Sequence, residues 1–140
     1  MPLLRPIPST RKWIVEENWY YTLPNELKIV IPKGFITDLV SVPRILWSLI
    51  SPTGSLLIPG LIHDFGYRFG YLWGVADGTV FKFATEQHKE FWDSLFLIVG
   101  KQANHKTLIN EIAYFFVSNF GYDSWEENKR KNEQDILVTF

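Results

Sequence analysis

The chain has 140 residues, a net charge of −1 and no cysteine, with 46% apolar and 21% charged residues. This length and composition predict one folded domain and exclude wholesale disorder. Without cysteine the chain has no disulfide, thiol nucleophile or thiolate metal ligand. Because its acidic and basic residues are interspersed, it gives no indication of nucleic-acid binding.

The chain begins with a proline-rich stretch at residues 1–10, which predicts an extended leader. These prolines interrupt the apolar core that a secretion signal needs, and no apolar run approaches the ~20 residues of a membrane span. We therefore expect no signal peptide and no transmembrane segment.

Runs of aromatic and β-branched residues predict three strands, at residues 13–15, 19–22 and 27–31. We expect the first two to pair as an N-terminal hairpin across a short polar loop. A turn at Pro24-Asn25 then leads into the third strand. Residues 12–37 are thus predicted to form a small antiparallel sheet.

Helical signals follow this sheet. A short helix is predicted from Ser41 or Val42 to about Ile50. A second is predicted from Pro59 to Gly70, because apolar residues recur there at helical spacing.

A second hairpin is predicted near residues 73–83, because Asp77-Gly78 is a strong turn dipeptide. The chain then returns to helical spacing. Thr85 is expected to cap a long helix that Gly100 ends.

Asn104 is expected to cap a last helix that runs to about Asn119. Residues 126–135 carry charges of both signs and predict a solvated segment. Together these elements predict a single α+β domain over residues 1–140, with a small antiparallel sheet, about four helices and the second hairpin.

The residues best suited to catalysis or metal binding lie on one predicted helix and are His63, Asp64 and Tyr67. His63 and Tyr67 share one face, whereas Asp64 is turned by about 100°. The imidazole can be a base or ligand, the carboxylate can hold a cation, and the phenol can orient either. Gly66 and Gly70 each cost about 1 kcal/mol in a helix, which indicates close approach by another segment or a ligand. Alternatively, the three polar residues form a buried network that fixes helix packing.

Asp38 is a second polar candidate, where the sheet gives way to the next helix. It can cap that helix, pair with Arg44, or supply an anionic ligand opposite Asp64. The candidate metal ligands are therefore Asp38, Asp64 and His63. A carboxylate-rich site suits calcium or magnesium, and a site that adds His88 suits zinc.

Three further titratable residues are weaker candidates. His88 either faces His63 as a second imidazole or is exposed in the first turn of its helix. Asp93 and Glu111 can each orient His63 from behind, and nothing in their spacing selects one of them.

Two blocks of sequence carry a resemblance to a known family. Residues 34–44 (GFITDLVSVPR) and 63–68 (HDFGYR) resemble a small family of phage and prophage proteins, domain of unknown function 1353. The resemblance covers roughly residues 30–120. It implies a phage or prophage origin, a place in the bacterial host cytoplasm or the virion, and protein partners from phage or host. It implies no established activity.

The pattern His63-Asp64-x-x-Tyr67 is also similar to the catalytic helix of secreted phospholipases A2. That resemblance implies that the histidine activates water, that the aspartate binds calcium, and that the tyrosine helps to hold a second aspartate behind the histidine. The flanking cysteines and the glycine-rich calcium loop of those enzymes are missing from this chain.

Two functions follow from these residues. The primary interpretation is a phage component for virion or tail assembly or for host interaction, in which His63, Asp64 and Tyr67 form a structural network. The alternative is a metal-assisted hydrolase of lipid or cell-envelope material, with His63 as general base or ligand. A site open to solvent would favour the hydrolase, and a sealed network the structural component.

Overall fold

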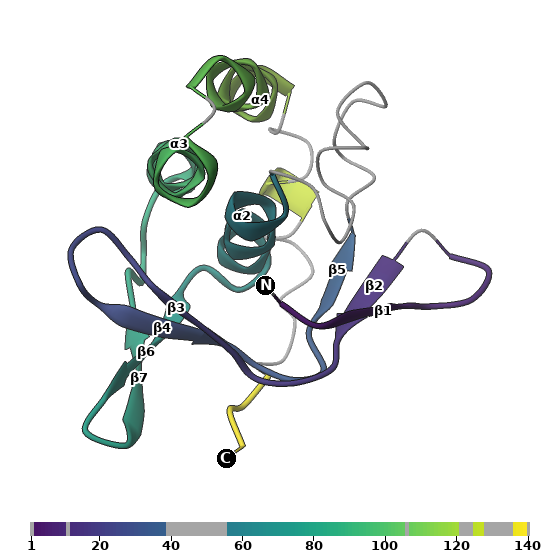
Figure 1. Cartoon of the computed structure of the whole chain (residues 1–140), viewed down its shortest axis with the longest axis vertical. Coiled ribbons are helices and arrows are strands. Elements are labelled where there is room, and N and C mark those ends of the chain that lie inside the picture. The colour runs from purple at the N-terminus through teal and green to yellow at the C-terminus, as the bar shows by residue number, and fades with distance from the viewer. Residues whose placement is uncertain are drawn as a thin grey trace.

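A computed structural model describes residues 2–10, 12–38, 56–105, 107–120, 125–127 and 136–139. These residues form an α+β fold with two antiparallel sheets, and Figure 1 shows the helices gathered on one side of the strands. The strands are β1 (Leu4–Pro6), β2 (Lys12–Val15), β3 (Trp19–Thr22), β4 (Lys28–Ile31), β5 (Ile36–Asp38), β6 (Leu72–Ala76) and β7 (Thr79–Phe83). The helices are α2 (Leu57–Phe69), α3 (Lys89–Asn104) and α4 (Thr107–Phe120), with one further helical turn at residues 125–127.

The two sheets share one long, bent hairpin. The first sheet has the order β1-β2-β5 and the second the order β3-β4-β6-β7. Trp13 pairs with Thr37 in the first sheet, and Tyr21 pairs with Ile29 in the second. The two pairs have the same strand register, so both belong to one continuous hairpin. Residues 12–22 therefore form one arm of this hairpin and residues 28–38 the other.

The predicted hairpin between residues 13–15 and 19–22 is wrong, because β2 and β3 do not pair with each other. The loop between them is held against the opposite arm. The backbone N–H of Lys33 donates to the Asn18 side chain (2.9 Å), and the N–H of Gly34 donates to the carbonyl of Val15 (2.8 Å). The chain reverses instead at Pro24-Asn25, as the turn residues there predict.

The second predicted hairpin is confirmed. β6 and β7 pair around Asp77 and Gly78, whose φ angles of 51° and 76° are those of a turn that matches the twist of the strands. The C-terminal segment at residues 136–139 is fastened to this sheet. Trp73 Nε1 donates to the Ile136 carbonyl (3.0 Å), and Asn18 Nδ2 donates to the Thr139 carbonyl (2.7 Å).

Helix α2 agrees with the prediction. It ends where Gly70 adopts a left-handed conformation (φ 78°) and donates its N–H to the Gly66 carbonyl (2.8 Å). Its buried face belongs to the main core, whose fully buried members come from α2, α3 and the strand regions of both sheets. They include Val15, Ile29, Phe35, Phe65, Leu72 and Trp92.

Helix α3 differs from the prediction at both ends. It begins at Lys89 rather than after Thr85, because Ala84 and Glu86 have positive φ angles (59° each) in a tight turn. It continues through Gly100. A Cβ atom there would lie 2.4 Å from Asn110 Oδ1, so this glycine permits close packing of α4 instead of ending the helix.

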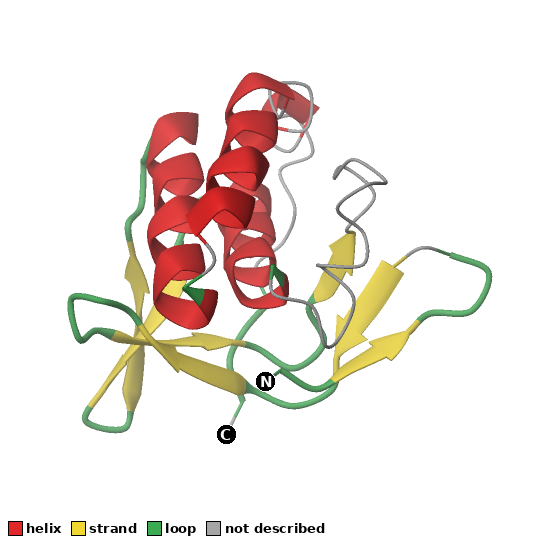
Figure 2. Cartoon of the chain, turned by 45° about the horizontal axis from the view of Figure 1, so that its top comes forward, coloured by secondary structure: helices red, strands yellow, loops and turns green. Residues whose placement is uncertain are grey.

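Helix α4 begins at Thr107, and Asn104 is the last residue of α3 instead of a cap. The three long helices stand side by side in Figure 2, with α3 packed against both α2 and α4. No helix in the described segments is long and apolar enough to cross a membrane. The helix predicted near residues 41–50 lies outside the described residues, as does most of the charged segment at 126–135.

Candidate functional site

The candidate site is built where α2 crosses α3. A Cβ atom on Gly66 would lie 2.3 Å from Cε3 of Trp92, so only glycine allows the two helices to approach this closely. The expectation that another segment packs closely on this helix is confirmed at Gly66. The crossing brings Asp93, the residue after Trp92, against the face of α2 that carries His63 and Tyr67.

Asp93 is the centre of the site. Its Oδ1 atom is hydrogen-bonded to His63 Nε2 (2.8 Å) and accepts a hydrogen bond from the Tyr67 hydroxyl (2.5 Å). Its Oδ2 atom accepts a hydrogen bond from Lys89 Nζ (2.6 Å). The Asp93 side chain is only 2% exposed, whereas that of His63 is 11% exposed. The site therefore consists of a buried carboxylate behind an imidazole that retains some access to solvent.

The electrostatics fix the hydrogen-bonding roles. Burial tends to raise the pKa of Asp93, but the hydrogen bonds from His63, Lys89 and Tyr67 outweigh it and lower that pKa below its ordinary value. An ionised carboxylate only accepts hydrogen bonds, so His63 donates through Nε2–H. Whenever the ring is neutral, Nδ1 carries its lone pair, and no described residue bonds to that nitrogen. This is the nitrogen that can accept a proton.

Two rings hold the imidazole in place. The Tyr67 ring centroid lies 4.0 Å from that of His63, and the Phe96 ring meets it edge-on at 5.5 Å. Tyr67 itself is buried and packs against Trp125. Packing on both sides restricts the rotation of His63, which is what an oriented base requires.

Asp64 faces β5 instead of Asp93, as its helical phase predicts. Its Oδ2 atom accepts a hydrogen bond from the buried Thr37 hydroxyl (2.6 Å). Arg68 is half-buried: its Nη1 donates to the Ile36 carbonyl (2.5 Å) and its guanidinium lies over the Phe35 ring. These contacts bring the two family-like blocks of sequence together.

The structure gives a different result for each of the remaining candidates, Asp38, His88 and Glu111. The side chain of Asp38 lies outside the described residues, together with Arg44, so the role of Asp38 stays a prediction. His88 is exposed and precedes the first turn of α3. Glu111 is half-exposed and pairs with Lys101 (2.9 Å), so of these two acidic candidates Asp93 is the one that bonds to His63.

A cation would need more ligands than these contacts supply. The predicted ligand set contains two carboxylates, and only the side chain of Asp64 lies within the described residues. One of its oxygens already bonds to Thr37. Within the described segments no three His, Asp or Glu side chains gather around one point. The predicted ligand set of Asp38, Asp64 and His63 therefore stays a prediction, and we derive no step through a metal.

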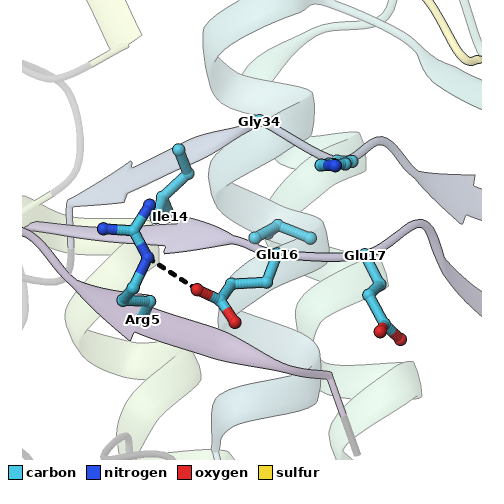
Figure 3. Close-up of a pocket in the computed structure, with 7 residues that line it drawn as sticks. Arg5, Ile14, Glu16, Glu17 and Gly34 are labelled. Carbon is cyan, nitrogen blue, oxygen red and sulfur yellow. Dashed lines mark hydrogen bonds and ion pairs between the residues drawn. The ribbon is translucent and has the colours of Figure 1, made fainter.

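A separate hollow of about 250 Å³ lies among the strands, lined by Arg5, Ile14, Val15, Glu16, Glu17, Lys33 and Gly34. Figure 3 shows Arg5 and Glu16 paired along it, through Nε and Oε1 at 2.6 Å. Both side chains are well exposed. None of the lining residues belongs to α2 or α3, so this hollow is distinct from the candidate site.

A family model described as "Protein of unknown function (DUF1353)" matches residues 13–117. The chain belongs to this family. The matched range contains both sequence blocks and every residue that contacts Asp93. No curated protein and no solved structure matches the chain.

Proposed function

We propose that this protein is a hydrolase of carboxylic esters whose general base is His63, oriented by Asp93. The observation that carries the proposal is the hydrogen bond between His63 Nε2 and the buried Asp93 carboxylate, to which Tyr67 also donates. A histidine backed in this way by a carboxylate is the arrangement found in many bases of hydrolytic enzymes.

The resemblance to secreted phospholipases A2 supports the same proposal. It implies a second aspartate behind the histidine, held by the tyrosine four residues further along the helix. In this chain the aspartate that bonds to both His63 and Tyr67 is Asp93, which comes from α3 and whose spacing does not distinguish it from Glu111. We therefore take an ester of a phospholipid or of cell-envelope material as the proposed substrate.

In this mechanism His63 Nδ1 accepts a proton from water, and the resulting hydroxide attacks the ester carbonyl carbon. The positive charge that forms on the imidazole is stabilised by the ionised Asp93. Lys89 donates to the other oxygen of Asp93 and helps to keep that carboxylate ionised. The proton on the ring can then pass to the departing alkoxide.

The test is hydrolysis of phosphatidylglycerol and phosphatidylethanolamine vesicles, with p-nitrophenyl butyrate as a small ester. Released fatty acid is measured with and without added calcium or zinc. We expect His63→Asn to lower the rate by about 10²-fold or more. The exposed His88→Asn is the matched control and should retain full activity. Absence of hydrolysis by the wild type under every condition would reject the proposal.

A structural role is the second candidate, because the Asp93 network joins three helices while leaving His63 only 11% exposed. In that role the protein would be a virion, tail-assembly or host-interaction component, and the phage origin implied by the family resemblance belongs to this proposal. The same His63→Asn variant separates the candidates. A lower melting temperature without any wild-type hydrolysis favours the structural role.

A further inference from the structure

Lys89 is buried to an extent that is unusual for a lysine. It is the first residue of α3, yet only 4% of its surface is exposed. Its ammonium donates to Asp93 Oδ2 (2.6 Å) and to the carbonyls of Val117 and Ser118 (3.0 Å each). Burying a charge is costly unless it is paired and hydrogen-bonded, so these contacts need to be maintained together.

These contacts assign each oxygen of Asp93 to different partners. Oδ1 accepts hydrogen bonds from His63 and Tyr67, whereas Oδ2 accepts one from Lys89. Rotation of the carboxylate would break the bond to Lys89 and move Oδ1 away from the imidazole. The ammonium thus fixes the direction in which Asp93 presents its acceptor to His63.

The other two acceptors of Lys89 lie in the last turn of α4. Carbonyls at a helix C-terminus have no partners within the helix, and a cation there also interacts favourably with the helix dipole. Lys89 is therefore a cap for α4 as well as a partner of Asp93. A cap alone would stabilise the fold without any effect on His63.

We propose that Lys89 is a positioning residue of the site, which holds Asp93 against His63 and anchors that carboxylate to the end of α4. The catalytic consequence rests on the proposed hydrolase function, whereas the effect on the geometry of His63 does not. The two can therefore be tested separately.

The test compares Lys89→Met with Lys101→Met, which removes the exposed lysine of the same helix that pairs with Glu111. The first measurement is the downfield proton NMR signal of the His63 Nε2–H that bonds to Asp93. We expect Lys89→Met to shift or broaden this signal and Lys101→Met to leave it unchanged. An unchanged signal in folded Lys89→Met would overturn the proposal.

The second measurement applies once wild-type ester hydrolysis is detected. Lys89→Met should then lower kcat by about 10- to 100-fold with little change in KM, as loss of an orienting partner does. A wild type without activity rejects the hydrolase function but leaves the NMR result for Lys89 valid. A normal kcat together with an unchanged NMR signal rejects Lys89 alone.

Lys89→Gln is the second variant if Lys89→Met does not fold, because it keeps hydrogen-bond donors and removes only the charge. If neither folds, the wild-type ammonium is observed directly by ¹⁵N-lysine NMR. Ammonium protons of Lys89 that exchange with water much more slowly than those of Lys101 are expected. Equally fast exchange at the two lysines contradicts the proposal.

Discussion

The α2–α3 and α3–α4 contacts both depend on a glycine for close packing, but they differ in the polar groups that they bury. Each depends on a glycine: a Cβ atom would lie 2.3 Å from Trp92 at Gly66 and 2.4 Å from Asn110 at Gly100. In the α3–α4 contact, the amide groups of Asn104 and Asn110 exchange two hydrogen bonds (2.9 and 3.3 Å). In the α2–α3 contact, the buried groups are charged.

The difference concerns the groups on which the proposed chemistry depends. The two asparagine amides bond to each other and hold the helices in register. Asp93 instead collects donors from two helices, and it leaves one nitrogen of His63 without a described partner. The neutral amide pair contains no group that takes up a proton near neutral pH, whereas the Asp93 network includes the imidazole of His63.

The largest effect is expected at Asp93. Asp93→Ala leaves the buried Lys89 ammonium without its counter-charge and should lower the free energy of unfolding by about 3–5 kcal/mol. Asn110→Ala, in the neutral contact, should cost about 1–3 kcal/mol. Urea unfolding measures both. Equal decreases in the free energy of unfolding would show that the charged network contributes no more to stability than the neutral amide pair.

A smaller effect is expected at the crossing glycine. Gly66→Ala forces Trp92 to shift and should destabilise the fold by about 1–3 kcal/mol. Gly60→Ala is the matched control on the same helix, because nothing lies within 4 Å of its Cβ position. That control should stabilise the protein by up to about 1 kcal/mol. A neutral Gly66→Ala would mean that α2 and α3 do not approach as closely as described.

The smallest expected effect is on the pH dependence of stability, compared between the wild type and Asp93→Asn. The pKa of Asp93 is lower in the folded state than its ordinary value of 3.8. Its contribution to stability is therefore fully present above about pH 4 and is lost as the pH falls through the lower, folded-state pKa. Melting temperatures measured from pH 6 down to pH 2 should fall more steeply for the wild type than for Asp93→Asn. Parallel curves would contradict the ionised state assigned to Asp93.

The helix with His63 was predictable because its apolar spacing and terminal glycine are local signals. The strand pairing was not, since 13–15 and 19–22 look like two halves of a hairpin. The contacts of Val15 and Asn18 with the opposite arm show that the chain bends there and reverses later, at Pro24-Asn25. Local patterns identify strands, but long-range contacts decide their partners.

The site was predicted in part. His63, Asp64 and Tyr67 share a helix, and their phases follow from 3.6 residues per turn. Asp93 was one of two candidates, and only the packing of Trp92 on Gly66 brings it to His63. Lys89 was not singled out. Its spacing of four residues from Asp93 was the available signal, but such pairs are usually exposed and weak.

The most direct test of the central claim is the protonation pattern of the His63 ring. In ¹⁵N-histidine-labelled wild type, at a pH where this ring is neutral, we predict that the proton resides on Nε2 and that Nδ1 shows the chemical shift of an unprotonated nitrogen. Asp93→Asn should weaken this preference, and His88 and His105, both exposed, provide internal references. A proton on Nδ1, or equal occupancy of the two nitrogens in the wild type, would contradict the assignment of His63 as an oriented base.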